Sequence, residues 1–204
     1  MDNWNQFSLE GIGEEIKDIL FSYVKAESIT YSSGEKQAES FFLSYFKNQP
    51  YWQEHPECVG TKPIKDDPFD RAAAFAMVRG KGDKTIVFVH HNDVVTVEDY
   101  DRLRPLAFSP DELEAELKKR ADSFSEEIRN DLESDAYLYG RGVCDMKGGG
   151  SIQMALLRRY SELARCSPEA LPGNLIVLAV PDEENLSAGM RAAVTLLAEL
   201  KEQY

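Results

Sequence analysis

Three short stretches of the 204-residue chain contain side chains that could bind metal ions and transfer protons. The first is His91-Asn92-Asp93 after an apolar run, the second is Asp145 in a glycine-rich stretch, and the third is Glu183-Glu184 after another apolar run. Imidazole and carboxylate groups are common metal ligands, and two-metal hydrolases hold their ions roughly 3.5–4 Å apart. Together the three stretches predict a two-metal hydrolase site.

His91 stands at the carboxyl end of a predicted buried strand that begins at Thr85. Side chains two residues apart on an extended chain point the same way, so His91 and Asp93 can converge. The imidazole could then bind a metal ion while the carboxylate fixes its orientation. His90 should point to the opposite face. The alternative is a polar rim at a strand end, without a metal.

Asp145 lies in a glycine-rich stretch before a predicted helix that starts near Met146 or Lys147. A carboxylate there could place one oxygen on each of two ions. The alternative is a phosphate-binding loop of a nucleotide-binding α/β domain. That alternative fits poorly, because the G-x-x-x-x-G-K-[ST] spacing is absent and Asp145 occupies the third glycine position of G-x-G-x-x-G.

Glu183 and Glu184 emerge at the carboxyl end of a predicted strand over residues 174–180, which Pro181 ends. One glutamate can bind a metal ion, while its neighbour takes a proton from water and delivers it to a leaving amine. The alternative is a surface acidic cluster. Active sites of open α/β sheets form beyond the carboxyl ends of strands, where all three stretches would lie, and this favours the site.

The three motifs carry a family resemblance. H-x-D-V-V (91–95), G-R-G-x-x-D-M-K-G-G (140–149) and P-D-E-E-x-x-S-x-G-x-R (181–191) resemble the co-catalytic zinc peptidase and aminoacylase family. That family includes glutamate carboxypeptidases, aminoacylases, and acetylornithine and succinyl-diaminopimelate deacylases. The resemblance spans most of the chain, and the long segment between the first two motifs is most similar to arginine-utilisation proteins of bacterial amino-acid catabolism.

The resemblance implies a role for each site residue. His91 would bind one zinc ion, Asp145 would bridge two, Glu184 would bind the other, Glu183 would be the general base, and Asp93 would support His91. Cobalt or manganese would also suit these ligands. The implied reaction is hydrolysis of peptide or N-acyl amide bonds in small amino-acid-derived substrates, such as a small peptide or N-acyl amino acid, in arginine or amino-acid catabolism.

The chain departs from the family pattern in two places. Members usually have glycine where this chain has His90. They also carry a further acidic ligand after the glutamate pair and a final histidine near a distant C-terminus, with a lid or dimerisation domain between. We therefore expect residues 1–204 to be the N-terminal part of one metallopeptidase-like catalytic domain, whose complete protein forms homodimers. The alternative is a truncated, non-catalytic peptidase-like binding or assembly module.

The pattern of apolar residues predicts an α/β fold with three α/β/α layers, as in zinc exopeptidases, and a mostly parallel sheet that is incomplete at the C-terminus. Helices are predicted over residues 9–26, 147–164 and 188–200, and another begins at a capping box of Ser32 and Glu35. Residues 72–79 and 85–91 are predicted to be paired strands, and residues 48–68 a loop. An incomplete domain should expose apolar sheet edges and dissolve poorly.

Residues 98–135 form a charge-rich insertion between the first two motifs. Ser109-Pro110 and the pair Ser123 and Glu126 predict the starts of two short helices. The insertion could border a substrate cleft. It could equally be a solvated surface segment, because charge runs usually face water.

Composition disfavours several kinds of partner and location. The net charge of −13 disfavours nucleic acid and anionic membranes. No apolar run approaches the ~20 residues that span a membrane, and no secretion signal opens the chain. Three scattered cysteines match neither a disulfide framework nor a cysteine-rich zinc site, which indicates a reducing cytoplasm. Cys144 is expected to be a small buried residue rather than a nucleophile.

Overall fold

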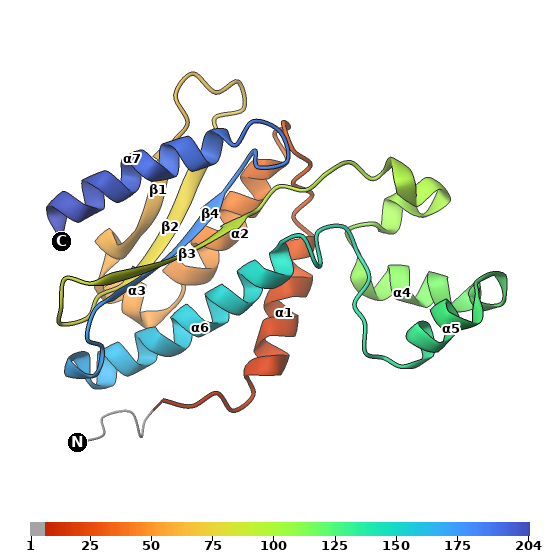
Figure 1. Ribbon diagram of the computed structural model, residues 1–204, viewed down its shortest axis with the longest axis horizontal. Helices are drawn as coiled ribbons and strands as arrows, with labels where there is room; N and C mark the ends of the chain where they lie inside the picture. Colours follow the sequence, from red (N-terminus) through yellow and green to blue (C-terminus); the bar gives the residue numbers. More distant parts are fainter. Residues whose placement is uncertain (1–6) are drawn as a thin grey trace.

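A four-stranded sheet forms the centre of the computed structural model, which describes residues 7–204 (Figure 1). The strands lie in the order β1-β2-β4-β3. Their bounds are β1 (Val59–Pro63), β2 (Ala72–Val78), β3 (Thr85–His91) and β4 (Asn174–Val180). β3 pairs with β4 in parallel, while β2 is antiparallel to both β1 and β4. Three strands therefore run in one direction and only β2 opposes them, which confirms the predicted α/β class.

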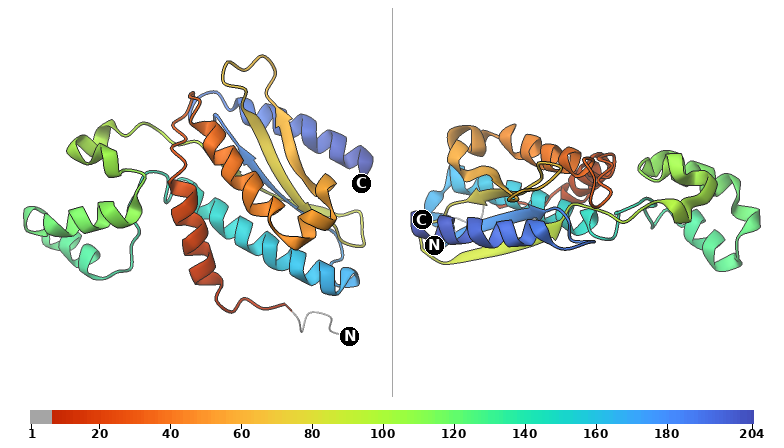
Figure 2. Two further views of the ribbon diagram at one scale, coloured as in Figure 1. Left: turned by 180° about the vertical axis from the view of Figure 1, so that it is seen from behind. Right: turned by 90° about the horizontal axis from the view of Figure 1, so that it is seen from above.

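Helices cover both faces of the sheet (Figure 2). One face carries α2 (Glu35–Lys47) and α6 (Lys147–Cys166), with α1 (Ile12–Val24) packed against α6, and α7 (Ala188–Gln203) covers the other. Shorter helices flank them: α3 (Pro50–Glu54), η2 (Pro56–Cys58) and η5 (Pro168–Ala170). The predicted three layers are therefore present, and the long helices begin and end within three residues of the expected positions.

Two sequence-based predictions about strands are wrong. β2 and β3 do not pair, because β4 lies between them. β4 is apolar along nearly its whole length rather than alternating, as expected for a strand covered on both faces. The segment between β2 and β3 instead passes the end of β4, where the Lys81 N–H donates to the Leu171 carbonyl. Residues 48–68 are not a loop, since they contain α3 and β1. β1 is short, contains glycine and proline, and pairs only with β2, so its sequence signal is weak.

β3 lies at an edge of the sheet. Its residues Ile86 and Val87 are 58% and 36% exposed. An exposed apolar edge strand presents unpaired backbone groups that can pair with another chain. Poor solubility of the isolated chain remains a prediction.

The insertion extends away from the sheet as a separate group of short helices (Figure 1). It contains η3 (Glu98–Leu106), α4 (Pro110–Lys119), η4 (Ala121–Ser123) and α5 (Glu126–Glu133). The predicted helix at Pro110 is confirmed. The second helix is capped by Ser125 rather than Ser123, because the Ser125 hydroxyl accepts the Ile128 N–H.

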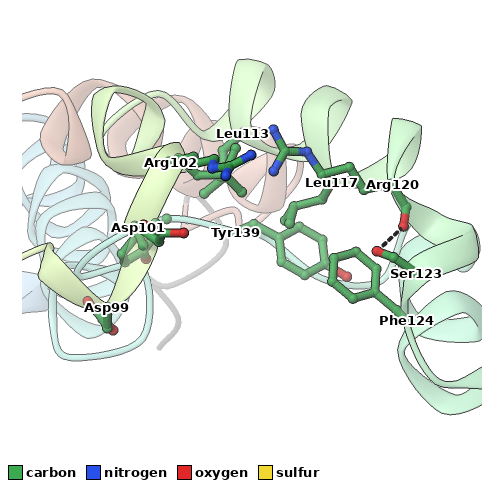
Figure 3. Close-up of a pocket in the computed structure, with 12 residues that line it drawn as sticks. Asp99, Asp101, Arg102, Leu113, Leu117, Arg120, Ser123, Phe124 and Tyr139 are labelled. Carbon is green, nitrogen blue, oxygen red and sulfur yellow. Dashed lines mark hydrogen bonds between the residues drawn. The ribbon is translucent and has the colours of Figure 1, made fainter.

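A hollow of about 490 Å³ opens between η3 and α4, where Figure 3 shows Tyr139 and Phe124 lying beside each other below Arg120. None of the predicted metal-site residues lines this hollow.

Among the described residues, no helix combines the length and the apolarity needed to cross a membrane.

His90 points away from His91 and is buried where β3 meets α6. In a neutral ring its Nδ1–H donates to Gln153 Oε1 (2.9 Å) and its Nε2 accepts from the Tyr23 hydroxyl (3.1 Å). Burial lowers the pKa of His90 to about 4, so the ring is neutral near pH 7. Gly150 of α6 makes room for this ring, since a Cβ there would lie 2.5 Å from His90 Cδ2.

Gly150→Ala should therefore destabilise the protein by about 1–3 kcal/mol, because the new methyl group overpacks the site of an anchored ring. Urea denaturation measures this free energy of unfolding. The matched control is Gly149→Ala in the same helix, where a Cβ would meet only Met146 Cε at 3.4 Å. That change should be neutral or stabilising. Equal effects of the two substitutions would contradict the packing account.

Candidate metal centre

His91 is the last residue of β3, and its ring is oriented by the backbone of Asp93. Its Nδ1–H donates to the Asp93 carbonyl at 3.0 Å. Its Nε2 consequently faces carboxylates, with Asp145 Oδ1 at 2.8 Å and Glu183 Oε2 at 3.9 Å. A histidine whose one nitrogen is fixed by an oxygen acceptor presents the other as a metal ligand.

Asp93 is fully buried and binds the two glutamates through their backbone. Its Oδ1 accepts the Glu183 N–H and its Oδ2 accepts the Glu184 N–H, each at 3.0 Å. Burial alone would raise the pKa of Asp93, but the hydrogen bonds from His91 and the two amides lower it. The carboxylate is therefore charged. Its Oδ1 lies 3.5 Å from His91 Nδ1, which is farther than the Asp93 carbonyl oxygen at 3.0 Å.

The glutamate pair follows β4 and lies beside His91. Parallel pairing continues one residue past the end of β3, since the Asn92 N–H donates to the Val180 carbonyl at the end of β4 at 2.9 Å. Side-chain ligand atoms of His91, Glu183 and Glu184 all lie within 4.8 Å of one another. Burial and the neighbouring carboxylates raise the pKa of Glu184, although His91 opposes this. The structure thus brings together residues from two sequence motifs that are more than 80 positions apart.

Asp145 brings the third motif to His91 from the loop before α6. Its carboxylate is 75% exposed and contacts His91 Nε2. Lys147, which is completely buried, holds this loop against the end of α1. Its ammonium group donates to the carbonyls of Tyr23 (3.1 Å) and Ala26 (2.6 Å). Burial lowers the pKa of Lys147 to about 7, although Asp93 acts in the opposite direction.

The electrostatics of the cluster suit a cation. Four carboxylates, those of Asp93, Asp145, Glu183 and Glu184, surround one imidazole. Burial lowers the pKa of His91, but Asp93 and Asp145 outweigh this effect and raise it to about 9. In the metal-free protein a proton on His91 therefore offsets part of the negative charge near pH 7. Nitrogen and oxygen donors at this spacing fit zinc, cobalt or manganese.

Sequence reasoning missed several residues that support the site. Lys147 was assigned no role, and Glu35 was predicted only to cap a helix. Arg71 drew no attention, although its buried side chain pairs with Glu35 and Asp182. The available signal was Asp182, a charged residue inside the third motif and directly before the glutamates. The expectation that Cys144 is buried is wrong, because it is exposed next to Asp145.

Comparison with known proteins gives a family and two relatives. The sequence model described as peptidase family M20/M25/M40 matches residues 87–204. Two proteins of Bacillus subtilis (strain 168) are similar over nearly the whole chain. The uncharacterized protein YqjN is 36% identical over 192 residues, which are 94% of this chain and 34% of YqjN. Protein RocB is 32% identical over 93% of this chain and 33% of RocB. The chain thus spans about a third of the length of these relatives.

Solved structures share the fold at low sequence identity. Human carnosine dipeptidase 1 matches 94% of this chain and 37% of its own, with a TM-score of 0.57 and 16% identity. The M20 family metallo-carboxypeptidase Sso-CP2 from Sulfolobus solfataricus matches 83% of this chain and 31% of its own, with a TM-score of 0.53 and 18% identity.

In the metal-free protein His91 should titrate with a pKa of about 9. Asp145→Asn should lower this pKa toward 6.5, because one of the two carboxylates that stabilise the imidazolium loses its charge. Imidazole ¹⁵N chemical shifts measured against pH report the titration. Glu169→Gln, which removes the exposed partner of Lys81, should leave it unchanged. A wild-type pKa near 6.5 would contradict the predicted electrostatics.

Proposed function

Because the chain belongs to peptidase family M20/M25/M40, we propose that it carries metal-binding and proton-transfer residues of a hydrolase that cleaves peptide or N-acyl amide bonds. Small amino-acid-derived substrates are proposed, and the similarity to RocB supports a place in arginine or amino-acid catabolism. The observation that carries the proposal is the convergence of His91, Glu183 and Glu184 within 4.8 Å, with Asp145 on the same imidazole.

His91 and Glu184 would each hold one divalent ion, zinc or alternatively cobalt or manganese, and Asp145 would bridge the two. Bound ions would polarise the scissile carbonyl and stabilise developing negative charge. The two structural neighbours are a dipeptidase and a metallo-carboxypeptidase, which supports peptide-type bonds as targets. The Asp145 carboxylate is exposed, so an ion that enters from solvent can reach it.

Glu183 is the proposed general base. Its side chain is 51% exposed, so water can reach it, and it extends to within 3.9 Å of His91 Nε2. Asp93 fixes the Glu183 backbone without touching its carboxylate, which leaves the carboxylate free to accept a proton from water and deliver it to the leaving amine.

The surroundings of the site supply further proposals. A cytoplasmic location is supported by three free cysteines. The net charge of −13 supports small-molecule substrates rather than nucleic acid or anionic membranes. A homodimer of the complete protein is proposed from the family resemblance.

Calorimetry on the metal-stripped chain should detect binding of Zn²⁺ at this cluster. His91→Ala should weaken Zn²⁺ binding by at least about 100-fold, because it removes a metal ligand. Loss of a residue that only hydrogen-bonds to a ligand already weakens metal binding by about 10–100-fold. His55→Ala is the matched control, since His55 is a half-exposed histidine outside the cluster. Unchanged affinity in His91→Ala, or no binding by the wild type, would contradict the proposed metal centre.

The proposed role of Glu183 as general base predicts that its substitution affects hydrolysis but not Zn²⁺ binding. Glu183→Gln should reduce hydrolysis of dipeptides or N-acyl amino acids by about 10²–10⁴-fold while Zn²⁺ affinity is retained. Glu184→Gln should instead weaken Zn²⁺ binding. Retained turnover in Glu183→Gln would remove this residue from the mechanism. Zn²⁺ binding by a wild type that hydrolyses no substrate would favour the non-catalytic binding module.

A further inference from the structure

A second buried charged cluster lies directly behind the glutamate pair. It consists of Arg71 before β2, Asp67 in the preceding loop, Glu35 at the start of α2, and Asp182 after β4. We call these four residues the Arg71 cluster. Each side chain is at most 3% exposed. None of the three sequence motifs contains Glu35, Asp67 or Arg71.

The guanidinium group of Arg71 connects the three carboxylates. Its Nη1 lies 2.6 Å from Glu35 Oε1 and 2.9 Å from Asp182 Oδ1, and its Nη2 lies 2.6 Å from Asp67 Oδ1. The second oxygen of Glu35 accepts the Asp182 N–H at 2.7 Å. Glu35 and Arg71 therefore hold both the backbone and the side chain of the residue that precedes Glu183.

The Arg71 cluster also supports the backbone conformation of Asp182. Its φ of 70° lies in the left-handed region, which costs free energy for a residue other than glycine, although aspartate adopts it more readily than most. Asp182 also closes the loop that follows, since its Oδ2 accepts the Ala188 N–H at 3.0 Å and its carbonyl accepts the Ser187 N–H at 2.6 Å. A change at Asp182 would therefore redirect residues 183–187.

The loop is thus held at two successive points. Asp93 binds the amides of Glu183 and Glu184, and the Arg71 cluster binds Asp182. Stability alone does not account for the cluster, because apolar residues of similar volume commonly replace a buried ion network without loss. Apolar residues could not supply the directional hydrogen bonds that hold Asp182.

We propose, on the premise that the glutamate pair binds cations as proposed above, that Glu35 and Arg71 are positioning residues that fix the Glu183 and Glu184 carboxylates for metal binding. Neither residue is part of the group of side chains that could hold the ion. Both act through Asp182.

Glu35→Gln tests the proposal with little change in shape. The neutral amide loses its ion pair with Arg71, so amide hydrogen exchange in residues 182–187, measured by mass spectrometry, should accelerate at least tenfold. Zn²⁺ affinity should fall about 10–100-fold, as for other partners behind a metal ligand. Arg71→Lys, which keeps the charge but loses the planar fork, should give a shift in the same direction and serves if Glu35→Gln does not fold.

The matched control is Arg158→Gln, which breaks an ion pair between α6 and Glu15 of α1. It should lower the free energy of unfolding but leave both exchange in residues 182–187 and Zn²⁺ affinity at wild-type values. Wild-type exchange or wild-type Zn²⁺ affinity in Glu35→Gln would overturn the proposal. If the wild type bound no Zn²⁺, the proposed function would fail by itself, and the exchange rates would still decide whether Glu35 holds the loop.

Discussion

The rest of the site depends on the hydrogen bonds that the Asp93 carboxylate accepts from the backbone of Glu183 and Glu184. This carboxylate is buried, charged and shared between the amides of two consecutive glutamates, so it joins the ends of β3 and β4 beyond the last backbone pairing. Two amide hydrogen bonds to one carboxylate fix both the distance and the rotation between the segments. The parallel register brings the ends of the two strands close together. Asp93 then holds the glutamates in a defined position beside His91.

The supports around this interaction come from helices on one face of the sheet. α1 receives the Lys147 ammonium group and so fixes the Asp145 loop, while α2 contributes Glu35 behind the glutamates. The loop before α6 is also joined to the insertion, because the Arg141 N–H donates to the Ala107 carbonyl at 2.7 Å and the Arg141 guanidinium group lies over the Tyr100 ring. The predicted site residues therefore lie at strand ends and in loops, while helices fix their positions.

Much of this arrangement is readable from sequence because its signals are local. A histidine and an aspartate two positions apart at a strand end must share a direction, and a proline after an apolar run places the glutamates outside the sheet. Strand order is different, since the placement of β4 between β2 and β3 depends on partners about a hundred residues away. Glu35 shows a second limit. Its spacing from Ser32 predicts a helix start two residues before the observed one at Glu35, and the Ser32 N–H does contact Glu35, yet the shortest contacts of Glu35 are to Arg71 and Asp182.

The contact between His90 and Gly150 restricts the order in which the two positions could change over evolution. A side chain cannot be added at residue 150 while the anchored ring occupies that space, so the ring must shrink first. The intermediate with a small residue at both positions then contains a cavity, which destabilises it. A lineage that changes between a histidine and a glycine at the position before His91 must therefore tolerate this less stable intermediate, and residues 90 and 150 should change together across descendants.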